Sequence, residues 1–302
     1  MTLSRKVFQV DHVLAGKIPT GDDHCRFDYN ILETEIQELV EDRLGNKVHG
    51  MSVPPKIPKT PKQCRTFVVA QMAEHVTAPP TIFRSYQAEG VAKSKCTIWE
   101  AARATSAAPS FFKPITIKNP PPLVTYVDGG LGYNNPAKLA LIEARRIWAD
   151  EDVCLVSIGT GHPSAISIVE ESQLENDLEV QRSFLKFVQS SISTLASYTI
   201  PRWNSAKNIP AGVLALLKMA GALTSIVTNS EGVHNEMDRD AHEKFPYFRF
   251  NVERNVGDIG LEDWKKLGAM TVHTKAYMET FDLENKKIMC AKCIIDPTAF
   301  GR

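Results

Sequence analysis

Short, almost wholly apolar runs alternate along this chain with segments of helical periodicity, and no other feature constrains the fold as strongly. The runs rich in strand-forming residues are 66–70, 81–86, 123–127, 153–158 and 245–252. Buried strands that alternate with helices are typical of a sheet that is covered on both faces. The sequence therefore predicts an α/β fold with a mostly parallel sheet flanked by helices. In such folds the chemistry lies beyond the carboxyl ends of the strands.

The first long helix is predicted from its periodicity and from residues that suit its ends. Apolar residues recur at three- and four-residue steps over residues 28–44. Asp28 or Asn30 is suited to the N-cap, because a short side-chain oxygen can accept a hydrogen bond from a free backbone N–H there. Gly45 is suited to the position just beyond the last turn.

Two further helix starts have sequence signals. Thr97 and Glu100 have the spacing of a capping box. Asn135 followed by Pro136 predicts a helix start, with Asn as the cap and Pro at the first helical position. We expect this helix to run through Trp148. Further helices are predicted over residues 171–198, 211–227 and 261–280.

The charge balance excludes several classes of protein. The 302 residues include 35 basic and 35 acidic side chains, so the formal net charge is zero. A nucleic-acid-binding protein that relies on an overall basic field is therefore not expected. Six cysteines are too few for a disulfide scaffold in a chain of this length. The first six residues contain no apolar run of the kind found in a secretory signal. We expect a cytoplasmic protein with reduced thiols.

The longest apolar stretch covers residues 211–227 and is interrupted only by Lys218. Its 17 residues, at ~1.5 Å each, are shorter than the ~30 Å hydrocarbon core of a bilayer. We therefore interpret the stretch as a buried helix or, as the alternative, a contact with a membrane surface.

The strongest candidate for chemistry is the segment that follows the predicted strand 123–127. Asp128 ends this strand, and Gly129 and Gly130 follow it directly. A carboxylate at the end of a buried strand is partly desolvated, which raises its pKa and makes it a better proton acceptor. Glycines at this point allow a close approach of the backbone to a substrate or a neighbouring loop. The alternative is an aspartate that only bonds backbone N–H groups in the turn.

Several segments together resemble the patatin-like phospholipases. They are Cys96–Phe112, Val127–Gly130, Asn134–Pro136 and Ser157–Gly161. The resemblance covers at least residues 1–161. The later segments 247–252 and 261–277 resemble patatin-like domains of fungal proteins.

The resemblance implies one three-layer α/β/α domain over residues 1–302. In it, residues 1–141 are the remaining part of the catalytic core, and residues 142–302 add C-terminal strands and helices. It implies hydrolysis of carboxylic esters in phospholipids or other lipids by a serine–aspartate dyad. Asp128 is then the proton acceptor, while Gly129 and Gly130 shape its turn. No metal and no organic cofactor are implied, and neither is a nucleic-acid partner. A lipid substrate implies transient contact with membrane surfaces.

One departure from the family pattern changes the expected activity. The family's nucleophile lies in a Gly-x-Ser-x-Gly elbow, and this sequence contains no such pentapeptide. Residues 50–54 come nearest but end in proline. Residues 3–8 resemble the end of the helix that follows the elbow in relatives. We therefore expect the chain to begin after the elbow, without the first strand, the oxyanion loop and the serine, and to be inactive alone. The alternative function is a non-catalytic module that binds lipid or another protein.

Cys290 and Cys293 form a Cys-x-x-Cys pair that suits a zinc or redox site. No second pair lies nearby, so two ordinary thiols are the alternative interpretation. The turn Gly159–Gly161 follows a strand and is able to hold an anion. A dinucleotide fingerprint requires a third glycine and an immediate helix, so a structural turn is favoured.

Two further groups of residues allow a functional and a structural interpretation. Glu231, His234 and Asp238 have helical spacing that suits metal ligands, but a solvated helix face has the same spacing. Phe111 and Phe112 are candidates for the wall of an acyl pocket or for ordinary core packing.

Overall fold

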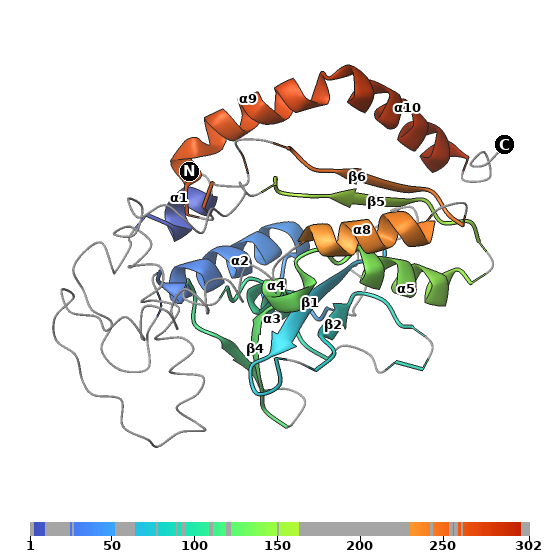
Figure 1. Cartoon of the computed structure of the whole chain (residues 1–302). Coiled ribbons are helices and arrows are strands. Elements are labelled where there is room, and N and C mark those ends of the chain that lie inside the picture. Colours follow the sequence, from blue (N-terminus) through green and yellow to red (C-terminus); the bar gives the residue numbers. More distant parts are fainter. Residues whose placement is uncertain are drawn as a thin grey trace, which may run out of the picture. The chain divides into compact units, whose positions relative to one another are not determined.

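The structure is a computed structural model of the whole chain (Figure 1). It describes residues 3–9, 25, 27–51, 64–162 and 230–296, apart from short gaps at 77, 89, 92–94, 109–110, 119–121, 150, 242–243, 254–255, 257–258 and 261. These residues fall into two compact units. Unit 1 comprises the described residues up to 87 and from 95 to 132, and unit 2 those from 133 to 162 and from 230 to 296, together with 88, 90 and 91. Each unit is described by itself.

Unit 1 is built around a small sheet and a few helices. Its helices and strands are α1 (Leu3–Val7), α2 (Tyr29–Leu44), β1 (Phe67–Met72), β2 (Thr81–Arg84), α3 (Ile98–Thr105), β3 (Ile115–Ile117) and β4 (Val124–Asp128). A short segment labelled α4 (Gly130–Tyr133) follows β4. Its residues Leu131 and Gly132 have non-helical backbone angles, so it is a turn rather than a helix.

The sheet of unit 1 has the strand order β2-β1-β4-β3, and every neighbouring pair is antiparallel. The α/β class is confirmed, but the expected parallel pairing is wrong for this sheet. Only eight residues separate β1 from β2, and only six separate β3 from β4. A parallel pair needs a crossover of about a dozen residues or more, so links this short allow only antiparallel neighbours.

Helix α3 lies against this sheet and positions its core. Its capping box is present, since Thr97 Oγ1 accepts from the Glu100 N–H and the Glu100 carboxylate accepts from the Thr97 N–H. Buried Ala101 and Ala104 of α3 pack in one cluster with Ala70 of β1. Small side chains at this contact let the helix approach the sheet closely.

Helix α2 covers the other side of α3. Its N-cap is Asp28, and Gly45 ends it with φ +70°, as the sequence predicts. Buried Leu32, Ile36 and Val40 follow the predicted helical spacing. They pack in a second cluster with α1 and with the aromatic residues that follow α3.

Unit 2 has three layers around a parallel strand pair (Figure 1). Its elements are α5 (Ala137–Ile147), β5 (Leu155–Ile158), α8 (Ser230–Ala241), β6 (Tyr247–Phe250), the 3-10 turn η2 (Trp264–Lys266), α9 (Leu267–Met278) and α10 (Phe281–Ile295). Side chains on one face of the strands pack against α5 and α8, and those on the other face pack against α10. This pair confirms the parallel pairing and the layered arrangement expected from the sequence.

The C-terminal helices differ from the prediction. The helix expected over residues 261–280 is η2 followed by α9, and α10 was not predicted. The predicted helices 171–198 and 211–227 lie outside the described residues. Within the part of the chain that the structure describes, no helix combines the length and the apolar character needed to cross a bilayer.

Candidate functional site

Asp128 is the last residue of β4 and is held there from two sides. Its N–H donates to the carbonyl oxygen of Ala107, just after α3, at 3.0 Å. It lies opposite Ala70 in the β1–β4 register. The predicted proton acceptor is therefore fixed between the end of a strand and the end of a helix.

The Asp128 carboxylate is partly buried and has one hydrogen-bonded oxygen. Oδ1 accepts from the Gly130 N–H at 2.7 Å, as in the turn expected for this sequence. Oδ2 has no hydrogen bond to any of the described residues. Burial raises the pKa of Asp128 above its usual value, and the hydrogen bond from Gly130 opposes this only in part. The carboxylate thus has a raised affinity for a proton and an oxygen that can accept one.

Gly129 is required by the close packing of β4 on β1. A Cβ built on Gly129 would lie 2.4 Å from the backbone oxygen of Val69, which no side chain can occupy. The same Val69 oxygen accepts a hydrogen bond from Thr105 Oγ1 at 2.6 Å. The glycine after Asp128 therefore allows β1, β4 and the end of α3 to meet at the carboxylate.

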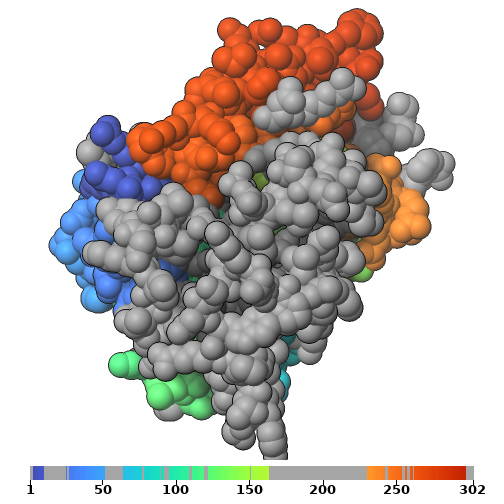
Figure 2. All heavy atoms as spheres, turned by 60° about the vertical axis from the view of Figure 1, so that its left-hand side comes forward, coloured from blue at the N-terminus to red at the C-terminus, as the bar shows by residue number. Residues whose placement is uncertain are grey.

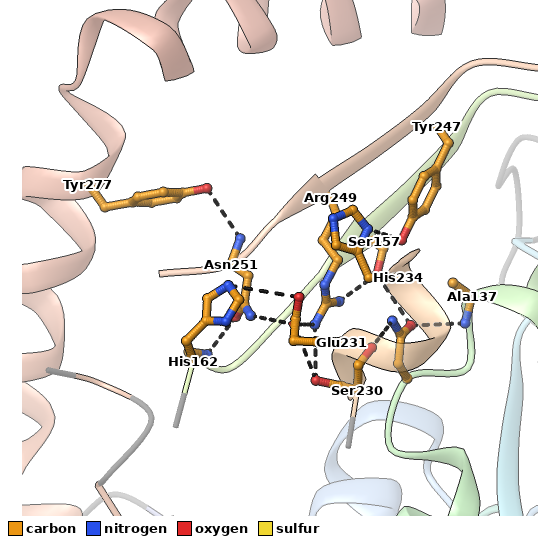
Figure 3. Close-up of polar contacts among 12 residues, drawn as sticks. Ala137, Ser157, His162, Ser230, Glu231, His234, Tyr247, Arg249, Asn251 and Tyr277 are labelled. Carbon is orange, nitrogen blue, oxygen red and sulfur yellow. Dashed lines mark hydrogen bonds and ion pairs between the residues drawn. The ribbon is translucent and has the colours of Figure 1, made fainter. Parts of the chain in front are cut away.

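The polar residues of unit 2 form a separate network around the carboxyl ends of β5 and β6 (Figure 3). Arg249 on β6 is buried, and its Nη1 donates to Ser157 Oγ on β5 at 2.8 Å. Its Nη2 donates to Glu231 Oε1, at the start of α8, at 2.9 Å. Asn251 Nδ2 donates to the same carboxylate oxygen at 2.9 Å. The network joins both strands to α8.

The glycine turn after β5 is held closed by this network. Gly161 N–H donates to Asn251 Oδ1 at 2.7 Å. The N–H of Gly159 donates to the backbone oxygen of the last β6 residue, and the N–H of His162 to a backbone oxygen two residues beyond β6. A Cβ on Gly159 would lie 2.2 Å from Asn251 Oδ1. Since these three amides are already bonded, the structural interpretation of the turn is favoured over anion binding.

Sequence reasoning missed this network. The alternating order Tyr247-Phe248-Arg249-Phe250-Asn251 contained the signal, because every second residue of the strand is polar or amphipathic. Side chains of that set share one face, and the structure places that face against α8.

Two weaker candidates, the cysteine pair and the Glu231–His234 group, make structural contacts among the described residues. Cys290 and Cys293 are buried free thiols on α10 that pack against Phe248. His234 Nδ1 contacts the hydroxyl of Tyr247 at 3.2 Å, and Glu231 pairs with Arg249 rather than with a metal. No group of three or more His, Cys, Asp or Glu side chains in the described ranges is arranged to hold a metal ion.

The phenylalanine pair lies in the core of unit 1. Phe112 is buried and packs near Phe8 and Phe27, with ring centroids 5.8 and 6.1 Å away. Phe111 stacks on Phe27 at 5.7 Å. Core packing is therefore the interpretation that the structure supports.

Comparison with known proteins finds that the segment containing this site is similar to a family of enzymes. Residues 21–141 match the model of the patatin-like phospholipases. This range contains α2, α3, β1, β4 and the Asp-Gly-Gly segment.

Full-length proteins of related sequence agree with this match. Mouse calcium-independent phospholipase A2-gamma is 29% identical over 286 residues, which are 92% of this chain and 30% of the mouse protein. Patatin-like phospholipase 1 of Plasmodium falciparum is 25% identical over 253 residues, 75% of this chain and 30% of that protein. Patatin-like protein 3 of Arabidopsis thaliana is 23% identical over 250 residues, 81% of this chain and 50% of that protein. The chain spans half or less of the length of these relatives. The matched segment and these relatives together support an assignment to the patatin-like phospholipases, with residues 21–141 as the part of the chain that matches the family model.

Proposed function

We propose that this chain carries the base half of a lipid acyl hydrolase site, with Asp128 as the proton acceptor of a serine–aspartate dyad. The substrate class is carboxylic esters of phospholipids or other lipids. The observation that carries the proposal is the Asp128 carboxylate itself, which is partly desolvated and bonded at Oδ1 only within the described residues. The protein acts from the cytoplasm at the surface of membranes, and the small number of cysteines in its sequence suits a reducing compartment.

In this proposal Asp128 accepts and then donates a proton in each half of the reaction. It takes the proton of a serine hydroxyl while the serine oxygen attacks the ester carbonyl, and it gives that proton to the departing alcohol. It then takes a proton from the water that attacks the acyl-serine, and returns this proton to the serine oxygen as the fatty acid leaves. The raised pKa favours the first step, because a carboxylate that binds a proton more tightly is the stronger base.

The sequence does not contain the motif in which the family's nucleophilic serine lies. No Gly-x-Ser-x-Gly elbow occurs in the 302 residues. Loss of the nucleophile of a serine hydrolase costs on the order of a million-fold in turnover, so we propose that the chain alone is inactive. One α/β/α domain over residues 1–302, completed by an elbow-bearing segment, remains our proposal for the active form.

The experiment compares the chain alone with the chain joined to an elbow-bearing segment of a patatin-like relative. Release of fatty acid from a fluorogenic phospholipid is the measurement. We expect no release by the chain alone and release by the fusion. Asp128→Asn in the fusion should lower the rate by about a thousand-fold or more, because the general base is removed.

A matched control separates loss of chemistry from loss of structure. Asp152→Asn removes an exposed carboxylate of similar size and should leave the rate unchanged. Hydrolysis by the unfused chain that disappears in its Asp128→Asn variant would refute the proposed incompleteness. An active fusion that tolerates Asp128→Asn would refute the role of Asp128.

The second candidate function is a non-catalytic module that binds lipid or another protein. The absence of the elbow from the sequence favours it. This function predicts that the unfused chain and its Asp128→Asn variant bind their partner equally well. Binding by the unfused chain, together with a fusion that never hydrolyses ester, would select this alternative.

A further inference from the structure

The Asp128 side chain lies on the face of the unit 1 sheet that α3 covers. Val124, Tyr126 and Asp128 alternate along β4, so their side chains share one face. Val124 and Tyr126 pack in the same cluster as the buried alanines of α3. Asp128 continues this row at the end of the strand, and its N–H donates to the carbonyl oxygen of Ala107, two residues after α3. The carboxylate therefore lies near the C-terminal end of this helix.

The end of α3 bonds to two neighbouring strands at this level. Thr105 is the last residue of α3, and its Oγ1 donates to the backbone oxygen of Val69 on β1 at 2.6 Å. The carbonyl oxygen of Ala107 accepts from the Asp128 N–H on β4 at 3.0 Å. Val69 precedes Ala70, which lies directly opposite Asp128. Both bonds thus act at the same end of the β1–β4 ladder.

Helix α3 is firmly held, so Thr105 is a fixed donor. Its N-terminus has a capping box. Arg103, two residues before Thr105, is fully buried and donates to the backbone oxygen of Lys113. Helix α2, whose blue atoms lie at the surface in Figure 2, covers the side of α3 that faces away from the sheet. A functional group is placed precisely only when the residues that support it are themselves locked by packing.

The Val69 oxygen also limits the turn that follows Asp128. A Cβ built on Gly129 would lie 2.4 Å from this oxygen, so the backbone of Gly129 rests against it. The next residue, Gly130, supplies the N–H that Asp128 Oδ1 accepts at 2.7 Å. A shift of the Val69 carbonyl would therefore move the turn and the carboxylate that the turn holds.

We propose that Thr105 is a positioning residue of this site, whose hydroxyl fixes the Val69 carbonyl and thereby holds the turn 128–130 and the Asp128 carboxylate in place. A threonine near the end of a helix commonly bonds a carbonyl of its own preceding turn. Thr105 instead bonds a strand residue 36 positions away. The inference rests on the proposed function in one respect, that Asp128 is the proton acceptor.

The test measures the pKa of Asp128 in the 302-residue chain, so it requires no serine and no hydrolysis. Aspartate residues are labelled with ¹³C at the carboxyl group, and the Asp128 signal is assigned from its loss in Asp128→Asn. Its chemical shift is followed by NMR between pH 3 and pH 8. Hydrogen exchange of the Asp128 and Gly130 amides is measured on the same samples.

Thr105→Val keeps the shape of the side chain and removes the hydroxyl. Burial is the largest cause of the raised pKa of Asp128, and a loosened turn admits water to the carboxylate. We therefore expect the pKa to fall toward the ordinary value of aspartate by about 0.5 or more. The two amides should exchange about tenfold faster, because the turn opens more often. Thr105→Ser keeps the hydroxyl and should restore both values.

The matched control removes another threonine hydroxyl from the same sheet. Thr116 Oγ1 on β3 bonds Thr125 Oγ1 on β4 at 3.1 Å. Thr116→Val should leave the pKa of Asp128 and the exchange of both amides unchanged. If Thr105→Val does not fold, Thr105→Ala provides the same test, because it removes the hydroxyl without placing a methyl group beside the Val69 oxygen.

An unchanged pKa of Asp128 in the folded Thr105 variant that lacks the hydroxyl would overturn the proposal. An equal fall in Thr105→Ser would show that the hydroxyl is not the cause, and an equal fall in Thr116→Val would show a general loosening of the sheet. Either result also overturns it. None of these results changes the ester-hydrolysis test of the fusion, in which Asp128→Asn tests the base directly, so the two proposals fail separately.

Discussion

At the scale of single residues, Asp128 combines a proposed chemical role with a cost in stability. Its carboxylate is partly buried in unit 1, and this burial disfavours the ionised form. A group whose pKa is raised in the fold binds its proton more tightly there than in the unfolded chain. Its ionisation therefore lowers the free energy of unfolding as the pH rises above about 4.

Asp128→Asn is expected to maintain or raise the melting temperature at pH 7. The amide has no charge to desolvate, and its Oδ1 can still accept from the Gly130 N–H. The difference between the two proteins should shrink as the pH falls toward the ordinary pKa of aspartate, where the wild-type carboxyl is protonated as well. Thermal unfolding followed by circular dichroism at pH 4 and pH 7 tests this. A lower melting temperature of the variant at pH 7 would contradict the cost assigned to the carboxylate.

Arg103 is the residue of unit 1 whose removal should cost most. It is fully buried on α3, its Nε lies 3.3 Å from Glu33 Oε1 on α2, and its Nη2 donates to the Lys113 backbone oxygen. Burial lowers the pKa of Arg103, and Glu33 opposes this. Arg103→Ala should lower the free energy of unfolding by about 3–5 kcal/mol, since it leaves a cavity and removes the partner of the Glu33 carboxylate.

Arg103→Met is the companion variant for this position. It restores the packing of the aliphatic stem without a charge, so we expect it to cost clearly less than the alanine. Urea titrations of both variants give the comparison. Equal losses would mean that the polar contacts of Arg103, and not the space it fills, dominate its contribution.

At the scale of elements, the network between β5, β6 and α8 makes unit 2 sensitive to acid. Burial lowers the pKa of His234, with a further contribution from Arg249, while Glu231 and Asp238 oppose it. Burial raises the pKa of Glu231, but its hydrogen bond and ion pair with Arg249 outweigh this, so the net shift is downward. Both groups favour the fold when deprotonated.

The expected acid sensitivity has two parts. The contribution of His234 is present above about pH 6.5 and is lost as the pH falls below that value, whereas the contribution of Glu231 is lost only below about pH 4.5. His234→Gln should remove the first loss and keep the second. Melting temperatures between pH 7 and pH 4 test this, with the exposed Asn235→Gln as a control on the same helix. An unchanged profile in His234→Gln would refute the assignment.

The ends of helices were predictable from the sequence where a few neighbouring residues determine them. The capping box at Thr97, the N-cap at Asp28 and the glycine that ends α2 are local signals, and each is present in the structure. Helix α10 was missed because its buried face is made of Leu283, Cys290 and Cys293, which form a weak apolar pattern among lysines. Helical spacing of these three residues, with Asp282 and Glu284 in the first turn, was the available signal.

At the scale of the whole molecule, the class of the fold was predictable and the pairing of its strands was not. The same apolar runs fit a parallel or an antiparallel strand, and only a short connection between two neighbours requires the antiparallel arrangement. For β1 and β2 the connection is short, and for β5 and β6 it is long. The Asp-Gly-Gly segment was found because it is contiguous, whereas the network around Arg249 joins that residue to Ser157, 92 positions away.

This separation also has a consequence for the order in which the chain folds during synthesis. Arg249 meets Ser157 only after 92 further residues have been made. At ~5–20 residues per second, β5 therefore waits on the order of 5–20 s for its parallel neighbour. The strands of unit 1 all precede residue 129, so its sheet can be complete while the ribosome is still far from β6. The nascent chain thus exposes an unpaired strand during that interval, and this is the stage at which a chaperone would have most to protect.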